Sequence, residues 1–230
     1  MRDQVNSLRV TVYSKRKQRP LPFLSTSLRG FTLIEMMVSV ALFLVVILIA
    51  VGSLVGMVDA DRKAQSIQSV VDNLDFALDD ISRTVRTGTV FHCVDGGTNP
   101  SAETAASMAT VGNCSSSGSL YMAVEGSAGS RVNVNDQIVY WFAPQATCGA
   151  GFVGGCIERS INSGGIFLPL TSPNVSIDAS HFYVIGASAG PIDHMQPKAT
   201  MVLTAHILLS DGTQTTLHLQ TTLTQRSYDE

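Results

Sequence analysis

The chain has 230 residues, of which 45% are apolar, enough for a membrane segment and one modest core in one or two domains. Its charge is uneven: residues 1–30 hold seven of the fifteen Lys and Arg against one acidic residue, whereas residues 31–230 hold eight basic and seventeen acidic residues. The resulting balance of −9 after residue 30, with no basic stripe, disfavours nucleic acid as a partner.

Residues 1–30 combine basic side chains with prolines and serines and lack a sustained apolar period, so we interpret them as a leader without a stable fold. Residues 36–58 carry no charge over 23 positions. As a helix they would extend about 34 Å, enough to cross a hydrocarbon core of about 30 Å. A basic segment before such a span predicts a cytoplasmic leader and an exported C-terminal part.

Glu35 is an acidic residue at the start of this apolar stretch. An ionised side chain inside a bilayer costs roughly 2.5–3.5 kcal/mol or more, so Glu35 is a candidate functional residue. The alternative is a glutamate at the interface end of an ordinary anchor. Further along, Gly52 and Gly56 lie four residues apart, which indicates either a small-residue seam for helix packing or a point where the helix can melt.

The six residues from Gly30 to Glu35, followed by the apolar helix, resemble the prepilin motif of the type IV filament family of pilins, minor pilins and type II secretion pseudopilins. The resemblance implies that a prepilin peptidase cuts after Gly30 and methylates the new terminal amine of Phe31. It also implies that Glu35 neutralises the amine of Phe31 on a neighbouring subunit during assembly. The expected partners are that peptidase, other pilin or pseudopilin subunits and the inner membrane.

The same resemblance implies a single-pass precursor in the inner membrane, with its head on the periplasmic or extracellular side, that later joins a pilus or pseudopilus. The length, the separated cysteines and the closing residues 219–226 look more similar to larger minor subunits than to a compact major pilin. No phosphate-binding glycine loop, HExxH or GxSxG motif is present. We therefore expect a minor pilin or minor pseudopilin that is a structural subunit, not an enzyme, and needs no cofactor.

The helix is expected to continue past Asp59, because apolar residues recur at steps of three and four and form one stripe. The stripe consists of Ile67, Val70, Val71, Leu74, Ala77, Leu78, Ile81 and Val85. Acidic residues precede basic ones on the remaining surface, which suits the helix dipole. Gly88 is a natural stop, so the sequence predicts one helix of about 80 Å over residues 32–87.

Four cysteines follow the apolar segment, where an oxidising compartment would allow disulfides. They are Cys93, Cys114, Cys148 and Cys156. Of the three possible connectivities we expect the nearest-neighbour pairing, in which closing a loop of about twenty residues stabilises the fold by roughly 3 kcal/mol. A zinc site is disfavoured because no pair has CxxC spacing and no histidine lies at a matching offset, whereas free buried thiols remain an alternative.

Residues 91–118 are rich in Gly, Ser, Thr and Ala and show neither a strand nor a helix period, so we expect a long loop held by Cys93 and Cys114. Beyond this loop, short β-prone runs separated by Gly, Pro, Asn and Ser predict strands. The candidates are residues 120–124, 137–142, 155–161, 181–185, 201–209 and 215–223. Residues 166–170 are broken by Pro169 and fit an edge strand or a turn.

The last two candidate strands also indicate how they pair. In both of them the odd positions form the more apolar face, which includes Leu203 and Leu219. A two-residue loop of Asp211 and Gly212 would pair odd with even positions and set an apolar face against a polar one. A three-residue loop that also includes Ser210 pairs odd with odd positions, so we expect a hairpin with this longer loop.

Other candidate sites have ordinary structural explanations. His206 and His218 could lie near each other on the hairpin, where solvated histidines are favoured over a two-ligand metal site. Tyr140 and Phe142 could form an aromatic platform, but at strand spacing they are favoured as core residues. The acidic residues of the helix, among them Asp80, could suggest cation binding, but they fit a charged helix face better.

These elements predict an α+β protein in which a long N-terminal helix packs on an antiparallel sheet. The expected divisions are a removed leader at 1–30, a membrane-spanning or filament-core helix at 31–58, its amphipathic continuation at 59–87 and an exported β-rich head at 88–230. The alternative is a signal-anchored surface protein or filament-tip module whose head binds an unknown surface ligand or DNA.

Overall fold

The computed structural model describes residues 30–130, 132–188, 195–208 and 214–226, and the chain divides into two compact units, residues 1–53 and residues 54–230. Helix α1 (Leu33–Thr87) has 55 residues and contributes to both units. Its bounds confirm the predicted helix to within one residue. Every described residue from 30 to 65 is exposed.

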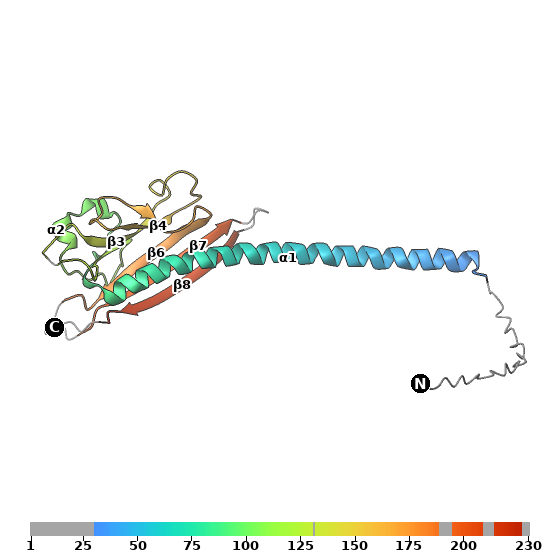
Figure 1. Ribbon diagram of the computed structural model, residues 1–230, viewed down its shortest axis with the longest axis horizontal. Coiled ribbons are helices and arrows are strands. Elements are labelled where there is room, and N and C mark those ends of the chain that lie inside the picture. Colours follow the sequence, from blue (N-terminus) through green and yellow to red (C-terminus); the bar gives the residue numbers. More distant parts are fainter. Residues whose placement is uncertain (1–29, 131, 189–194, 209–213, 227–230) are drawn as a thin grey trace, which may run out of the picture. The chain divides into compact units, whose positions relative to one another are not determined.

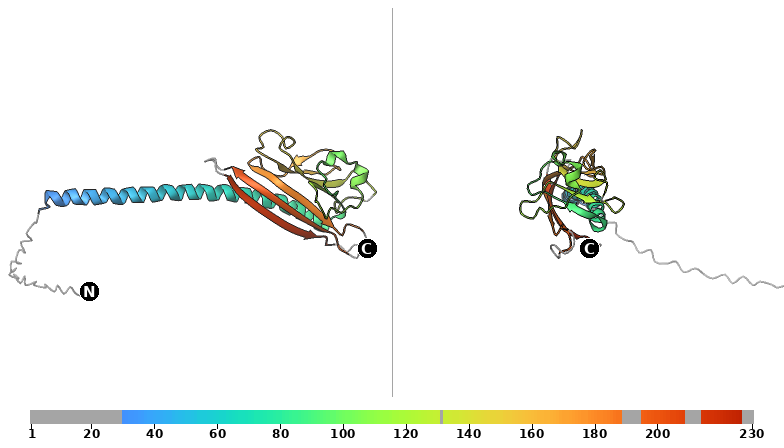
Figure 2. Two further views of the ribbon diagram at one scale, coloured as in Figure 1. Left: turned by 180° about the vertical axis from the view of Figure 1, so that it is seen from behind. Right: turned by 90° about the vertical axis from the view of Figure 1, so that its left-hand side faces the viewer.

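The part of α1 in the second unit buries one apolar stripe. Val70, Leu74, Ala77 and Ile81 are at most 4% exposed, as the periodicity predicts. Val71 differs from the prediction, because it lies on the flank of the stripe and is 37% exposed. Figures 1 and 2 show this part of the helix lying along the strands of the head.

The predicted α+β fold, with a long helix packed on antiparallel β-structure, is confirmed. Within the described residues the head contains two antiparallel sheets in place of the single sheet expected. The first sheet has the order β1 (Thr89–His92), β2 (Tyr121–Glu125), β3 (Gln137–Ala143), β4 (Cys156–Ser160) and β5 (Leu168–Pro169). The second has the order β6 (Val175–Ile185), β7 (Lys198–Leu208) and β8 (Gln214–Thr224). Thus β5 is an edge strand that includes Pro169, one of the two arrangements expected from that proline.

Strand β6 is longer than its prediction because a β-bulge interrupts its pattern. The pairing with β7 shifts between Ile177 and Ala179. Val175 and Ile177 are buried before the bulge, whereas Phe182 and Val184 are buried after it, so the core face changes from odd to even positions. A strict period of two recognises only the second half of such a strand.

The register of the terminal hairpin is confirmed. Leu203 lies opposite Leu219 and Ala205 opposite Leu217, which pairs odd with odd positions. This register places the apolar faces of β7 and β8 on the same side. Residues 209–213, which contain the expected loop, lie outside the described residues.

The long loop expected at residues 91–118 contains more regular structure than its composition suggests. It begins within β1 and includes a 3-10 helix (Pro100–Ala102) and the short helix α2 (Ala105–Met108). A capping box between Thr104 and Ser107 fixes the start of α2, since each side chain accepts the backbone N–H of the other residue. A helix of one turn is too short to show a repeating pattern of apolar residues, so its sequence resembles that of a loop.

The largest buried cluster is shared by α1 and both sheets. It includes Leu74 of α1, Phe142 of β3 and Phe182 of β6, and the two phenylalanine rings stack with their centroids 4.4 Å apart. The opposite face of the first sheet is also covered, by a second cluster that contains Trp141 and a third that contains Met108. Because β2 and β3 are covered on both faces, their sequences are apolar almost throughout.

Gly88 provides a test of the close packing where α1 meets the first sheet. A Cβ atom at this position would lie 2.7 Å from the carbonyl oxygens of Thr84 and Glu125 and would also overlap the side chain of Val124. Gly88→Ala is therefore expected to lower the free energy of unfolding by about 1–3 kcal/mol, the usual cost of overpacking. The fluorescence of Trp141, the only tryptophan, would report thermal unfolding of the head in detergent-solubilised full chain.

Gly52→Ala is the matched control, because a Cβ at Gly52 would meet no atom within 4 Å. We expect no loss of head stability in this control. An equal change in both variants would contradict the packing argument.

Candidate functional site

The start of α1 is fixed by Thr32. The backbone N–H of Glu35 lies 3.1 Å from the Thr32 carbonyl and 3.3 Å from its hydroxyl oxygen, and the N–H of Met36 lies 3.2 Å from the same carbonyl. Thr32 is thus the N-cap residue, and Glu35, three positions later, completes the sequence pattern of a capping box. The role of Thr32 was missed in the sequence reasoning, although the spacing of Thr and Glu is a sufficient signal.

Gly30 and Phe31 precede the helix and are open to solvent. Phe31 is 78% exposed, and both residues lie in non-helical backbone. A Cβ atom on Gly30 would meet no atom within 4 Å, so packing against the described residues does not require a glycine there. Among the described residues, none therefore covers the Gly30–Phe31 peptide bond.

The helix that follows has an uncovered apolar surface on every side. The large apolar side chains from Leu33 to Val58 are between 38% and 79% exposed. Within the described residues, α1 is the one helix long and apolar enough to cross a membrane. Glu35 is the only charged residue between positions 30 and 58.

Residues 27–51 match the family described as the prokaryotic N-terminal methylation motif. The chain carries the processing motif of type IV pilins and pseudopilins. The motif indicates a membrane-anchored precursor and a structural subunit, processed by a prepilin peptidase and assembled with other pilins. Comparisons with curated proteins and with solved structures found no match.

This pilin-type precursor has two disulfides in its head. One joins Cys93 to Cys114 and the other joins Cys148 to Cys156, which is the nearest-neighbour pairing. The first lies in the core shared with α1, and the second lies in the cluster on the opposite face of the first sheet. The disulfides therefore fasten the loops on both sides of that sheet.

Cys148, Cys156 and Glu158 bring their ligand atoms within 4.8 Å of one another. The two sulfur atoms are bonded to each other, so neither is available as the thiolate ligand that a metal requires. Burial raises the pKa of the Glu158 carboxyl above its ordinary value. This group is better explained as a disulfide beside a buried acid than as a metal centre.

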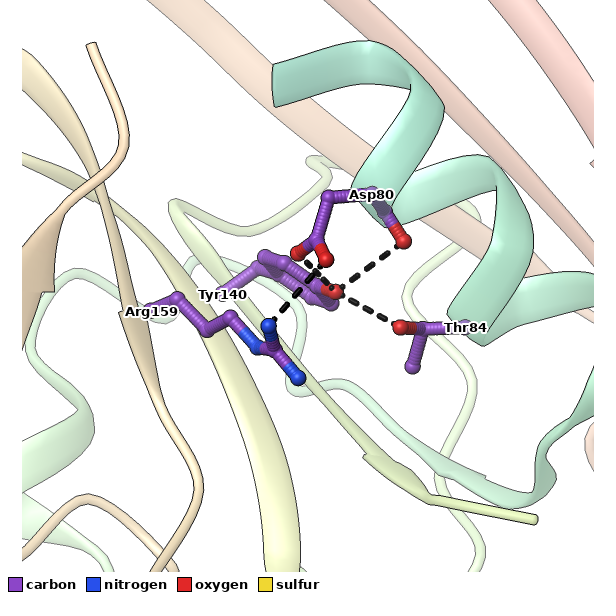
Figure 3. Close-up of polar contacts among 4 residues, drawn as sticks. All are labelled: Asp80, Thr84, Tyr140 and Arg159. Carbon is purple, nitrogen blue, oxygen red and sulfur yellow. Dashed lines mark hydrogen bonds and ion pairs between the residues drawn. The ribbon is translucent and has the colours of Figure 1, made fainter. Parts of the chain in front are cut away.

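A polar cluster ties α1 to the first sheet (Figure 3). The hydroxyl of Tyr140 on β3 donates to the Asp80 carboxylate at 2.8 Å and lies 2.7 Å from the Thr84 hydroxyl. The guanidinium of Arg159 on β4 lies 3.1 Å from the other carboxylate oxygen of Asp80. Burial raises the pKa of Tyr140, so its phenol stays neutral and serves as a structural donor.

The two hairpin histidines are held by threonines of the opposite strand. His206 Nδ1 lies 3.1 Å from the Thr216 hydroxyl, and His218 Nδ1 lies 3.0 Å from the Thr204 hydroxyl. His206 Nε2 also lies 2.9 Å from the Asp178 carboxylate. In the described parts of the chain, neither histidine belongs to a group of three potential metal ligands.

Glu158→Gln is expected to stabilise the head at pH 7. The raised pKa means that the folded state holds the proton more tightly than the unfolded state does, so wild-type stability falls as pH rises through the window above about 4.5. The glutamine variant has no such loss. The midpoint of thermal unfolding should therefore be higher for the variant at pH 7, and the difference should shrink near pH 4.

Asp72→Asn, at an exposed position on α1, is the charge-matched control and should show no such pH-dependent gain. An identical gain for Glu158→Gln at pH 4 and pH 7 would contradict an origin in ionisation.

Proposed function

We propose that the protein is a minor pilin or minor pseudopilin of a type IV pilus or a type II secretion-like filament. The precursor is cleaved after Gly30, methylated on the amine of Phe31 and then assembled through its N-terminal helix. The observation that carries this proposal is the methylation motif at the start of a helix whose apolar surface is exposed on every side.

The exposed helix supports the proposed route from membrane to filament. A helix that is apolar all round requires either lipid or other apolar helices around it. Lipid supplies this cover for the precursor, and the helices of neighbouring subunits supply it in the filament. Open space around Gly52 and Gly56 leaves room for such helices to approach closely.

Glu35 is the proposed assembly residue. After cleavage, the chain begins with a charged amine at Phe31, four positions before the carboxylate. An ammonium and a carboxylate that enter an apolar helix bundle must pair to offset the loss of hydration. We propose that Glu35 pairs with the amine of a neighbouring subunit, which aligns each incoming helix with the preceding one.

The charge distribution supports export of the head. The basic residues before residue 30 favour retention of the leader on the cytoplasmic side. The head then occupies the periplasmic or extracellular side, and the two disulfides are compatible with such an oxidising compartment.

Processing predicts a defined N-terminus. Protein extracted from membranes of cells that contain a prepilin peptidase should begin at methylated Phe31, as read by N-terminal peptide mass spectrometry. Gly30→Leu should retain the leader, while its open surroundings leave the rest of the fold unchanged. A wild-type protein that keeps its leader in such cells would contradict the proposed processing.

Glu35→Gln tests the proposed charge pairing. Glutamine at this position can still support the helix cap, so the substitution removes the charge and keeps the local capping capacity. We expect the variant to insert normally into the membrane, but its amount in sheared filament fractions should fall at least about tenfold. The reason is that the Phe31 ammonium of the neighbouring subunit would be buried without a partner, which costs several kcal/mol. Quantitative immunoblots of membrane and filament fractions would measure both values.

Ser39→Ala is the matched control one turn along α1, where the hydroxyl bonds only the Met36 carbonyl among the described groups. It should insert and assemble like the wild type. Normal incorporation of Glu35→Gln would exclude the proposed role of the charge.

A further inference from the structure

The outer edge of β6, on the side away from β7, is bonded to other segments at Val184, Phe182 and Ile177. The Val184 carbonyl accepts the Cys114 N–H at 3.0 Å, and the edge is open between the other two points. At one point Phe182 and Ser119 exchange two backbone hydrogen bonds of 2.8 Å. At the other, the N–H of Ile177 donates to the Gly155 carbonyl at 2.8 Å. Within the described ranges, residues 178–181 have no backbone partner on this edge. We call this opening the β6 gap.

Ser180 directs its backbone N–H and C=O into the β6 gap. Both groups of a strand residue point to the same side, and successive residues alternate between the two sides. Because Phe182 bonds outward to Ser119, Ser180, two residues earlier, also points outward. Ser180 is only 6% exposed, so its donor and acceptor require a partner from water or from a ligand.

A cavity of about 580 Å³ lies along the β6 gap. Leu120, Phe142 and Ile177 give it an apolar lining, whereas Thr147 and Asp178 are among its polar residues. Among the described residues, no Lys or Arg lines it, and His181 is its one residue with a basic side chain. Its size falls within the range of about 300–1,000 Å³ that is usual for ligand pockets.

The chemistry of the cavity favours a peptide over a sugar. Trp141 also lines the cavity, but it is buried and its indole N–H donates to the Thr98 carbonyl at 3.0 Å. The one polar group of its ring is therefore already paired within the protein. The paired N–H and C=O of Ser180 instead match one residue of an extended chain, in the way that Phe182 already matches Ser119.

We propose that the β6 gap binds a short extended segment of a partner protein, which adds a strand to the outer edge of β6. An extended chain advances about 3.3 Å per residue, so the stretch between Ile177 and Phe182 accommodates about four residues. A central apolar side chain of the segment packs against Leu120 and Phe142. The absence of Lys and Arg and the presence of Asp178 disfavour an acidic segment.

The test uses purified full-length protein in detergent and a mixture of N-acetylated, C-amidated tripeptides with an apolar central residue, which with their two capping groups match the length of the opening. Mass spectrometry would identify the peptides that the immobilised protein retains. Thr147→Trp should reduce retention at least about tenfold by filling the cavity, and a change at this exposed position should leave the fold intact. Thr224→Trp, exposed at the end of β8 and outside the cavity lining, is the control and should retain peptides like the wild type.

Amide hydrogen exchange tests the strand pairing itself. A retained peptide should slow the exchange of the Ser180 N–H roughly tenfold, as one new hydrogen bond does, and should change little at Phe182, whose N–H is already bonded. N-methylation of the central peptide amide should remove the donor that pairs with Ser180 and weaken retention.

Three outcomes would overturn the proposal: no retained peptide, equal retention by Thr147→Trp, or retention without protection of Ser180. Because the assay needs neither the peptidase nor a filament, its failure leaves the proposed processing and assembly untouched.

Discussion

Leu74, Ala77 and Ile81 of α1 are at most 1% exposed because they pack into a core to which both sheets contribute. The head depends on this contact. Two sheets that each bury a face need a shared apolar surface between them, and the helix stripe supplies part of it. Tyr140 and Asp80 add a directional polar contact to this packing, which fixes α1 against β3.

The two parts of α1 are suited to different surroundings. Its second part has an amphipathic pattern that suits a protein core on one side and water on the other. Its first part is apolar on every side and lacks protein cover, so it suits lipid or a bundle of similar helices. Glu35 lies at the start of that first part, where a lone carboxylate is costly and a paired one can specify alignment.

The bulge in β6 lies beside the proposed peptide site. By inserting one residue between Ile177 and Ala179, it changes which positions face the core. Ile177 and Phe182 are both covered at the outer edge, while Ser180 between them is not. The bulge therefore lies next to the β6 gap, where the backbone groups of Ser180, between the two covered residues, lack a partner within the described chain. In the proposed arrangement the head carries the peptide site, while the N-terminal part of α1 serves assembly.

The sequence by itself determined α1, the membrane-compatible segment, most strands and the register of β7 with β8, because these follow from local periodicity and turn length. The sequence also indicated Glu35 as a candidate functional residue, because it is a charged residue at the start of an apolar segment. Only the tertiary structure decided the division into two sheets and the change from odd to even core-facing positions along β6. It also decided the contact of Asp80 with Tyr140 and Arg159, which lie 60 and 79 residues further along the chain. The opening at Ser180 likewise exists only because Ser119 and Gly155 fold back to β6 from distant segments. Periodicity reports which face of an element is buried, whereas the identity of the element that covers it depends on how the whole chain packs.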